Sequence, residues 1–420
     1  MLAAYDPDML PTAPDLDTLA SERARLWEFG RRSVHTAGGF AWLDDTGQPV
    51  LDRPVEAWVT CRMTHVAALE VLAGHEDARR ELDHGVAALR TTLYDAEHGG
   101  WFAAVDVSSG GAPVPTVPEK RCYEHAFVLL AAASATAAGH PDGEALLADA
   151  VGVFEDRFWR EDEGMAAESW DRGWTKLEDY RGANANMHTV EALLAVHDVT
   201  GEAVWLQRAE RILTRVVHQV ARPAEWRLPE HFTPAWEPVR DYNRDSPADP
   251  FRPYGVTIGH LLEWSRLALH VRSAYLVRGA DAPDWLLEDA QGLFEAAVRD
   301  GWHVDGEDGF VYTVDFDGTP VVRTRLHWVL AEGIAAAWAL AGATGEEGYL
   351  DWYAVWWDQA ERRFIDRVDG SWRHELDEHH QPSTTVWTGK PDVYHAYQAA
   401  LLPSLRPAGS FVGSFLGPAS

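Results

Sequence analysis

The chain of 420 residues lacks the features that mark exported, disulfide-bonded and membrane-spanning proteins. Its only cysteines, Cys61 and Cys122, imply no disulfide framework and stand in no CxxC spacing. The first residues, MLAAYDPDML, have neither the basic nor the apolar region of a signal peptide. The longest apolar, small-residue stretch, Ala126–Gly139, is too short to span a bilayer. We therefore expect a soluble cytoplasmic protein that does not interact with membranes.

Positive charge is also scarce, because 36 Lys and Arg residues stand against 66 Asp and Glu residues, for a formal net charge of −30. A charge of this sign disfavours binding to nucleic acid and to anionic membrane surfaces. It is typical of a well-solvated acidic exterior. We expect no nucleic-acid partner.

The motifs of several common catalytic sites are missing. The chain has no glycine-rich phosphate loop, no Gly-x-Ser-x-Gly nucleophile elbow and no His-Glu-x-x-His zinc motif. His379 and His380 lie in the polar stretch Asp377–Pro382, which is typical of a solvated turn. We predict that the protein uses no catalytic metal.

A histidine-bearing helix start recurs six times in what remains, in the segments CRMTH, RCYEH, NANMH, GVTIGH, TRLH and GKPDVYH. The histidines that close these segments are His65, His125, His188, His260, His327 and His395. The steps between them are 60, 63, 72, 67 and 68 residues, a period that fits two helices and a connecting loop. Six such units would supply twelve helices and bring six similar polar positions to one place.

The predicted helices are of two kinds. Alanine-rich helices that are apolar on most faces, as in helices buried all round, cover Pro54–Ala73, Arg121–Ala138, Arg181–Thr200, Tyr254–Leu276, Thr324–Gly342 and Lys390–Leu402. Amphipathic helices with charged outer faces cover Leu16–Thr36, Glu76–Leu93, Gly143–Arg157, Glu202–Val220, Ala282–Arg299 and Glu346–Arg363. This alternation predicts an all-α fold, an (α/α)6 barrel of six inner and six outer helices. No linker interrupts the repeat, so we expect one catalytic domain over residues 1–420.

Short β-hairpins are predicted in the connecting loops. Gly39–Val50 and Gly309–Val321 alternate apolar and polar residues around turns that contain Asp or Gly. Weaker copies begin near Gly100, Gly164, Trp226 and Gly370. We expect the proline-rich insert Pro229–Pro253 to form a loop over one end of the barrel.

The N-terminal ends of the inner helices should share one rim, where their positive potential favours an anionic ligand or intermediate. The polar side chains expected to surround a deep central pocket there are Arg62, Tyr123, His125, Asn184, His188, Arg252, His260, Glu263, His327, Glu332, Asp392 and His395. Tryptophans near helix starts, among them Trp58 and Trp328, have flat faces that suit a sugar ring, although most of the 20 tryptophans belong to the core.

A few of these residues form candidate chemical pairs. His260 and Glu263 are three residues apart on one helical face, where a carboxylate can fix the imidazole tautomer and raise its basicity. Glu332 lies in an apolar stretch and needs a partner such as one of the histidines, because an unpaired buried carboxylate is costly. Arg62, in a run that looks buried, is either a structural tie or a ligand clamp. His395 follows a helix-start signature and, taken alone, is more typical of a core histidine than of a catalytic one.

Five segments in order resemble the N-acylglucosamine 2-epimerase superfamily, and the resemblance covers nearly the whole chain. They are WVTCRM (58–63), NANMH (184–188), RPYGVTIGHLLEW (252–264), WVLAE (328–332) and GKPDVYH (389–395). Within the superfamily, the chain looks most like the branch of bacterial mannose isomerases and sulfoquinovose isomerases. The resemblance implies an (α/α)6 barrel that interconverts sugars without a cofactor.

By the same resemblance, His395 matches a histidine that moves a proton between C2 and C1 of a sugar through a cis-enediol. His260 matches a second histidine that assists ring opening and, in epimerases, serves the opposite face of C2. Glu263 and Glu332 match carboxylates that orient these histidines, and Arg62 matches an arginine that stabilises the enediolate. The resemblance and the expected pocket together give a substrate-binding set of Asn184, His188, Arg252, Trp328, Tyr123, Trp58 and Asp392.

Proton abstraction beside an aldehyde needs a near-neutral base and stabilisation of the developing oxyanion, which this set supplies. We therefore expect an aldose–ketose isomerase that interconverts D-mannose and D-fructose, with D-lyxose and D-xylulose as a further pair. A sugar 2-epimerase and a sulfoquinovose isomerase also fit the pattern. From another class, so does a glycoside hydrolase that uses Asp392 with Glu263 or Glu332. The expected partner is a monosaccharide substrate, and the expected assembly is a monomer or a homodimer.

Overall fold

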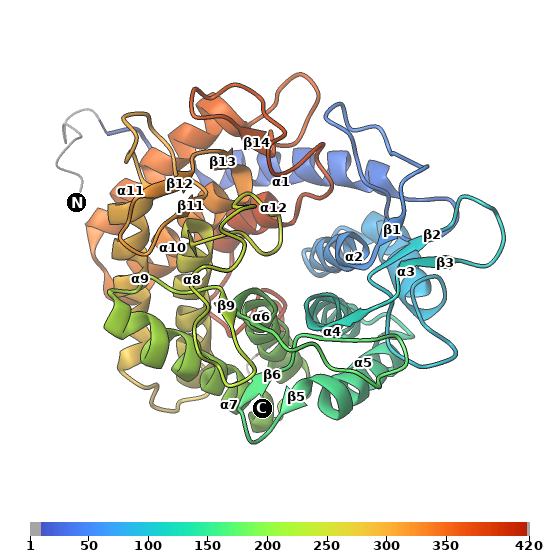
Figure 1. The fold of residues 1–420 in the computed structure, drawn as a ribbon. Helices are drawn as coiled ribbons and strands as arrows, with labels where there is room; N and C mark the ends of the chain where they lie inside the picture. The colour runs from blue at the N-terminus through green and yellow to red at the C-terminus, as the bar shows by residue number, and fades with distance from the viewer. Residues whose placement is uncertain (1–9, 418–420) are drawn as a thin grey trace.

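The computed structural model describes residues 10–417, and in that range twelve α-helices follow one another around a ring (Figure 1). The inner helices are α2 (Ala57–Leu72), α4 (Cys122–Ala137), α6 (Ala183–Thr200), α8 (Ile258–Leu276), α10 (His327–Thr344) and α12 (Tyr394–Leu401). The outer helices are α1 (Leu16–Gly30), α3 (Arg79–Arg90), α5 (Gly143–Val153), α7 (Ala203–Leu213), α9 (Trp285–Gly301) and α11 (Glu347–Gln359). The predicted (α/α)6 barrel is confirmed. The single domain over residues 1–420 stays a prediction.

The two layers follow from the two sequence patterns. In α4, every residue from Glu124 to Ala135 is buried, as a helix apolar on all faces requires. In the outer helix α3, Leu82, Val86 and Leu89 are buried while the charged side chains of Arg80, Asp83 and Arg90 are exposed. None of the helices within residues 10–417 is long and apolar enough to cross a membrane.

Most helix ends lie close to their predicted positions. The outer helices α5, α7 and α11 continue as π-turns over Phe154–Phe158, Thr214–Ala221 and Ala360–Phe364. The clearest error is the start of α12, which was expected at Lys390 but begins at Tyr394. The carboxylate of Asp392 accepts a hydrogen bond from the backbone N–H of Tyr394, the first residue of α12, so that residues 390–393 remain in the preceding loop.

Short strands join neighbouring units. They are β1 (Val55–Glu56), β2 (Ala104–Asp106), β3 (Val114–Val117), β4 (Lys120–Arg121), β5 (Trp159–Arg160), β6 (Met165–Ala166), β7 (Ser169–Trp170), β8 (Arg181–Gly182), β9 (His231–Phe232), β10 (Val256–Thr257), β11 (Thr313–Val314), β12 (Pro320–Val322), β13 (Arg325–Leu326) and β14 (Glu375–Leu376). The strand that leads into an inner helix pairs antiparallel with a strand of the next unit, in the pairs β1–β2, β4–β7, β8–β9, β10–β11 and β13–β14.

This pairing gives the first N–H of five inner helices an acceptor in the next unit. The carbonyls that accept are those of Ala103, Glu168, Glu230, Tyr312 and His374. The ring closes when the N–H of Lys390, before α12, donates to the carbonyl of Leu43 in the first unit. The residues that carry these carbonyls are therefore held at the rim where the inner helices begin.

The predicted hairpins are present in several forms. The segment 309–321 contains β11 and β12, which pair with each other, whereas the segment 39–50 is held by an isolated bridge between Leu43 and Pro49. The insert Pro229–Pro253 is not wholly a loop, because β9 lies within it. Its C-terminal part, with Phe251, reaches the mouth of the barrel and packs against Trp58 and Trp387.

Candidate active site

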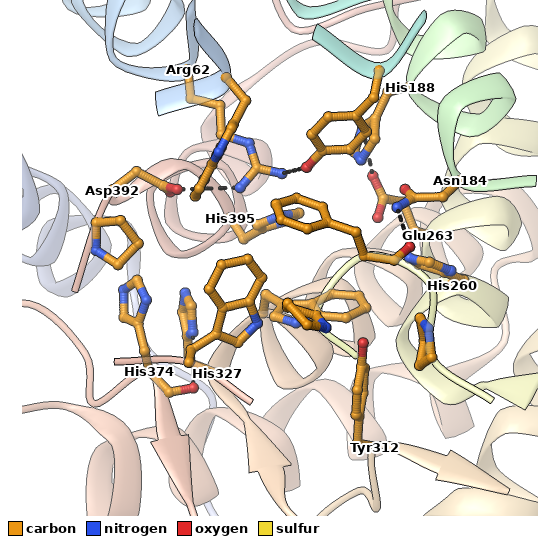
Figure 2. Close-up of a pocket in the computed structure, with 18 residues that line it drawn as sticks. Arg62, Asn184, His188, His260, Glu263, Tyr312, His327, His374, Asp392 and His395 are labelled. Carbon is orange, nitrogen blue, oxygen red and sulfur yellow. Dashed lines mark hydrogen bonds and ion pairs between the residues drawn. The ribbon is translucent and has the colours of Figure 1, made fainter. Parts of the chain in front are cut away.

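A cavity opens at the rim where the inner helices begin (Figure 2). Its lining residues are Trp58, Arg62, Tyr123, Asn184, His188, Pro250, Phe251, Pro253, His260, Glu263, Tyr312, His327, Trp328, His374, Trp387, Pro391, Asp392 and His395. They come from every inner helix or the loop before it, and from the insert. Ten of the twelve side chains proposed from sequence as catalytic or substrate-binding line this cavity, so distant segments do converge.

His395 is held from behind by a buried carboxylate. Its Nδ1 donates to Oε1 of Glu332, 2.8 Å away, which leaves Nε2 free to face the cavity. Burial lowers the pKa of His395 below its ordinary value, and the hydrogen bond to Glu332 opposes that shift. Glu332 does not line the cavity itself. The partner that its buried position requires is therefore His395, together with Arg266 at 2.8 Å.

His260 has a carboxylate of its own, but not the expected one. Its Nδ1 donates to Oε1 of Glu230 at 2.7 Å, and Glu230 is buried just before β9. The prediction that Glu263 orients His260 is wrong, because Glu263 points to another part of the site. The rings of His260 and His395 lie on the same indole, with centroids 5.4 and 5.8 Å from that of Trp328. Both imidazoles thus carry the same Nδ1–carboxylate arrangement in one cavity.

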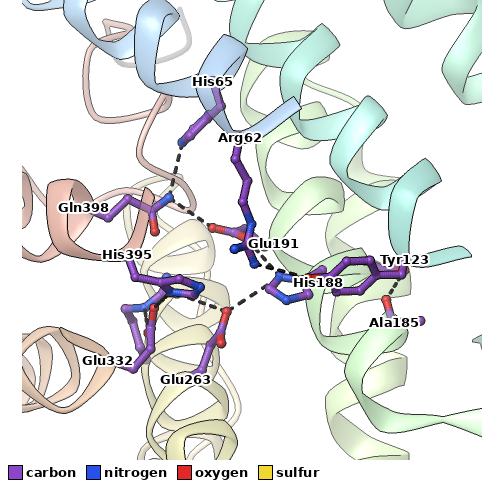
Figure 3. A network of polar contacts seen from close by, with 12 residues as sticks. Arg62, His65, Tyr123, Ala185, His188, Glu191, Glu263, Glu332, His395 and Gln398 are labelled. Atoms are coloured by element: carbon purple, nitrogen blue, oxygen red, sulfur yellow. Dashed lines mark hydrogen bonds and ion pairs between the residues drawn. The ribbon is translucent and has the colours of Figure 1, made fainter. Parts of the chain in front are cut away.

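Glu263 belongs to a charged layer beneath the cavity (Figure 3). Its Oε1 lies 3.7 Å from Nδ1 of His188 and 3.6 Å from the guanidinium of Arg266. Burial, with the charge of Glu332 second, raises the pKa of Glu263 well above its ordinary value. Burial opposes ionisation of Glu332 too, but Arg266 and His395 bring the pKa of Glu332 below its ordinary value. Of these two neighbouring carboxyls, Glu263 is therefore the one whose surroundings favour the neutral form.

Arg62 is a buried cation on the opposite wall of the cavity. Its guanidinium donates to Asp392 at 3.2 Å and to the hydroxyl of Tyr123 at 3.3 Å. It also lies over the rings of Trp58 and Tyr394, at 4.9 and 4.8 Å from the centroids. Its Nε has no hydrogen-bond partner among residues 10–417. The side chain is fixed in place and keeps a donor to spare, as an oxyanion site requires.

The remaining lining residues are polar groups with unused capacity. The amide of Asn184 donates weakly to the carbonyl of Phe251 at 3.5 Å, and its buried Oδ1 has no partner in the described part of the chain. Burial lowers the pKa of His188 to about 4, which keeps its ring neutral. His327 and His374 stack with ring centroids 3.7 Å apart, and burial lowers the pKa of His327 to about 3.

Besides Glu332, two side chains expected around the pocket do not line it. The guanidinium of Arg252 forms a bidentate pair with Glu178, at 2.8 and 3.0 Å, in a neighbouring cleft. His125 is also outside the cavity, because its Nε2 accepts the backbone N–H of Trp101. The expectation that these two residues border the central pocket is therefore wrong for their side chains.

Sequence reasoning missed Glu230, Tyr312 and His374, which reach the site from hairpins rather than from inner helices. Each of them immediately precedes a hairpin strand and accepts the first N–H of an inner helix through its carbonyl. Glu168 occupies the corresponding place in an earlier unit. A polar or aromatic residue precedes four of the five strands in this position, with Ala103 as the exception, and this recurrence was the signal that could have revealed them.

Two triads of potential metal ligands occur beneath the cavity among the described residues. They are His188, Glu191 and Glu263, and Glu263, Glu332 and His395. Arg266 stands between them, with Glu332 at 2.8 Å and Glu263 at 3.6 Å. A guanidinium at this distance already compensates the carboxylates and would repel a second cation. The triads are better described as an ion-pair network that supports the histidines.

The arrangement can move protons next to a developing oxyanion. Two imidazoles present Nε2 to one space, each tied at Nδ1 to a carboxylate that fixes its tautomer. Arg62 and the N-terminal ends of the inner helices supply positive potential to the same space. Trp328 and Trp58 offer apolar faces. This set suits acid–base chemistry on a small polyhydroxylated substrate.

Comparison with known proteins agrees with this description. The model of the N-acylglucosamine 2-epimerase (GlcNAc 2-epimerase) family matches residues 38–399. A D-mannose isomerase from Thermobifida fusca is 54% identical over 397 residues, which cover 94% of this chain and 96% of that protein. A D-mannose isomerase from Pseudomonas cannabina pv. alisalensis is 49% identical over 399 residues, 95% of each chain.

Solved structures give the same picture for the fold. A crystal structure of D-mannose isomerase superposes with a TM-score of 0.85 at 27% identity, covering 94% of this chain and all of the other. The structure of cellobiose 2-epimerase from Spirochaeta thermophila superposes with a TM-score of 0.77 at 20% identity, covering 92% of this chain and 95% of the other. At that identity, the second likeness speaks for the fold alone.

Proposed function

The chain belongs to the N-acylglucosamine 2-epimerase family, and we propose that it is an aldose–ketose isomerase that interconverts D-mannose and D-fructose. The observation that carries the proposal is the pair of carboxylate-bound imidazoles on either side of Trp328, opposite a buried arginine. Relatives at 54% and 49% identity that are D-mannose isomerases support the choice of sugar.

His395 is the proposed base. With the sugar open, its neutral Nε2 takes the proton from C2, and the electron pair of the C–H bond forms the C1–C2 double bond of a cis-enediolate. The negative charge moves to O1, where Arg62 stabilises it. The same proton is then returned to C1 while the proton of the O2 hydroxyl passes to O1, so that C2 becomes the carbonyl, C1 carries the hydroxyl and no redox partner is needed.

His260 is the proposed acid–base group for ring opening, because its Nε2 faces the cavity while Glu230 fixes Nδ1. It would take the proton of the anomeric hydroxyl and pass it to O5 as the C1–O5 bond breaks. Asn184, His188, Tyr123, Trp58, Trp328 and Asp392 are proposed to bind the sugar. Arg252 would bind the sugar only after its ion pair with Glu178 breaks.

A 2-epimerase is the second candidate, because two imidazoles in one cavity could serve the two faces of C2. A sulfoquinovose isomerase has less support. Arg62 is the only arginine or lysine among the lining residues and is paired with Asp392, which leaves no free cation for a sulfonate. A glycoside hydrolase needs two carboxyl groups at the substrate, but Asp392 is held by Arg62 and Glu332 lies behind His395.

The test is incubation of the purified protein with D-mannose in D2O, followed by NMR of the products. Isomerisation gives D-fructose with deuterium at C1 where the transferred proton exchanges with solvent, whereas epimerisation gives D-glucose labelled at C2. D-Lyxose is the further substrate to include. If the protein forms neither product, the proposal is overturned.

We also propose a cytoplasmic monomer or homodimer, to be checked by fractionation and light scattering.

A further inference from the structure

A second cavity, of about 260 Å³, lies at the end of the barrel opposite the active site. It is enclosed by the C-terminal parts of α8 and α10 and by residues 402–414, which follow α12. Much of its wall is apolar and includes Leu269, Trp338, Leu402 and Phe411. It shares no lining residue with the catalytic cavity, so its ligand would differ from the sugar substrate.

Two arginines border this cavity. Arg272 makes no hydrogen bond or ion pair with any residue in the described range 10–417, although the chain has a net charge of −30. Arg406 also lines the cavity, and its guanidinium donates only to the carbonyl of Gly413, at 2.8 Å. The charge of Arg406 also acts on the buried carboxylate of Asp198, but neither Arg406 nor Arg272 forms an ion pair within 4 Å among the described residues. Beside an apolar wall, the two guanidinium groups form a surface complementary to an amphiphilic anion.

His270 adds a polar group inside the cavity. The side chain is 8% exposed and has no hydrogen-bond partner within the described residues, and its ring packs edge-on against Phe411. Burial, together with the charge of Arg266, lowers the pKa of His270 to about 3, so the ring is neutral. A ligand in the cavity can therefore use the ring nitrogens of His270 as a hydrogen-bond donor and acceptor.

We propose that this cavity is a binding site for a small amphiphilic monocarboxylate, whose carboxylate pairs with Arg272 and Arg406 and whose apolar part fills the space beside Leu269, Trp338 and Phe411. The inner helices end here, and their C-terminal carbonyls carry partial negative charge. The two full positive charges of Arg272 and Arg406 outweigh this partial negative charge. A cationic amphiphile would meet both arginines and is excluded by the same charges.

The position of the site relates it to catalysis. Phe411, on the wall of the cavity, lies 5.7 Å from the guanidinium of Arg266. Arg266 binds Glu332, which in turn holds His395. A ligand against Phe411 therefore sits on one side of the charged layer whose other side positions His395. Binding is the primary claim, and it can be measured without any sugar present.

The test compares three probes with one tail, namely octanoate, 1-octanol and octylamine, by isothermal titration calorimetry on the full chain. We expect octanoate to bind one site per chain, at least about tenfold tighter than octanol, and octylamine not to bind. Arg272→Gln should bring octanoate binding to the level of octanol. D-Mannitol, a linear polyol for the catalytic cavity, should not displace octanoate.

A matched pair of variants locates the site. Gly342 lies on α10 at the cavity, and a Cβ there meets nothing within 4 Å, so Gly342→Trp should obstruct the space and abolish binding. Gly152, on α5, is equally open but remote, and Gly152→Trp should bind octanoate as the parent protein does. Equal binding of octanol and octanoate, unchanged binding in Gly342→Trp, or displacement by mannitol would each overturn the proposal.

Discussion

Nδ1 of His260 lies 2.7 Å from Oε1 of Glu230, thirty residues earlier in the chain, although Glu263 is only one helical turn away. The same Nδ1–carboxylate contact holds His395 against Glu332, 63 residues earlier. In both pairs the carboxylate accepts from Nδ1, so that Nε2 is the basic nitrogen of the neutral ring. The active site thus has two similarly oriented imidazoles whose partners come from different kinds of element, a hairpin and a helix.

Glu230→Gln should lower kcat about 10- to 100-fold and leave KM within about twofold, because the amide no longer fixes the tautomer or stabilises an imidazolium. The ¹⁵N shifts of the His260 ring, assigned by difference with His260→Asn, should change between the parent and the variant. Glu237→Gln, an exposed position on the same hairpin, is the matched control. An unchanged tautomer with unchanged kcat would remove Glu230 from the mechanism.

His395→Asn should reduce kcat by about 10³-fold or more, since it removes the base that moves the C2 proton. His379→Asn, on an exposed turn, should have parental activity. Circular dichroism and thermal melting establish that both variants are folded. Substantial turnover by a folded His395→Asn protein would show that another group transfers the proton.

The pH dependence of kcat/KM should report the burial of His395. The base must be neutral, and burial lowers its pKa, so activity should persist below the ordinary histidine range and fall only at more acidic pH. Glu332 raises that pKa through its hydrogen bond. Glu332→Gln should therefore move the acid limb to still lower pH and reduce the plateau rate. A shift of the limb to higher pH would contradict this assignment.

Glu263→Gln should change the free energy of unfolding by less than about 1 kcal/mol at pH 7, because burial and the charge of Glu332 favour the neutral carboxyl of Glu263, which glutamine resembles. Glu332→Gln removes an ionised partner of Arg266 and should cost about 3 kcal/mol. Urea denaturation of both variants, with the parent protein as reference, compares the two carboxyls directly. Equal destabilisation by the two substitutions would contradict this difference between the two carboxyls.

The helices of the barrel were predictable because their signals are local. An alanine-rich helix such as α4, buried on every side, and an amphipathic one such as α3 differ in the spacing of their apolar residues. The polar starts of the inner helices also fix which end carries the site. His260 and His395 could therefore be placed at the same rim from the sequence alone.

The partners of these histidines were not equally predictable. Glu263 looked right for His260 because helical spacing is visible in the sequence, whereas Glu230 reaches His260 only through the register of β8 with β9. The predictions for Arg252 and His125 were wrong for the same kind of reason, because Glu178 binds Arg252 and the backbone N–H of Trp101 binds His125. Contacts that depend on hairpin register or on competing partners produce no periodic pattern in the sequence.

The contact between Arg62 and Asp392 joins residues 330 positions apart, at the first and last inner helices. Nearly the whole chain must therefore be synthesised, and the last unit must dock on the first, before the guanidinium acquires its partner and His395 enters the cavity. Bringing such distant segments together is entropically slow. Catalytic competence should consequently appear late in folding, after most helices have formed, and a nascent chain that ends before residue 395 should be inactive.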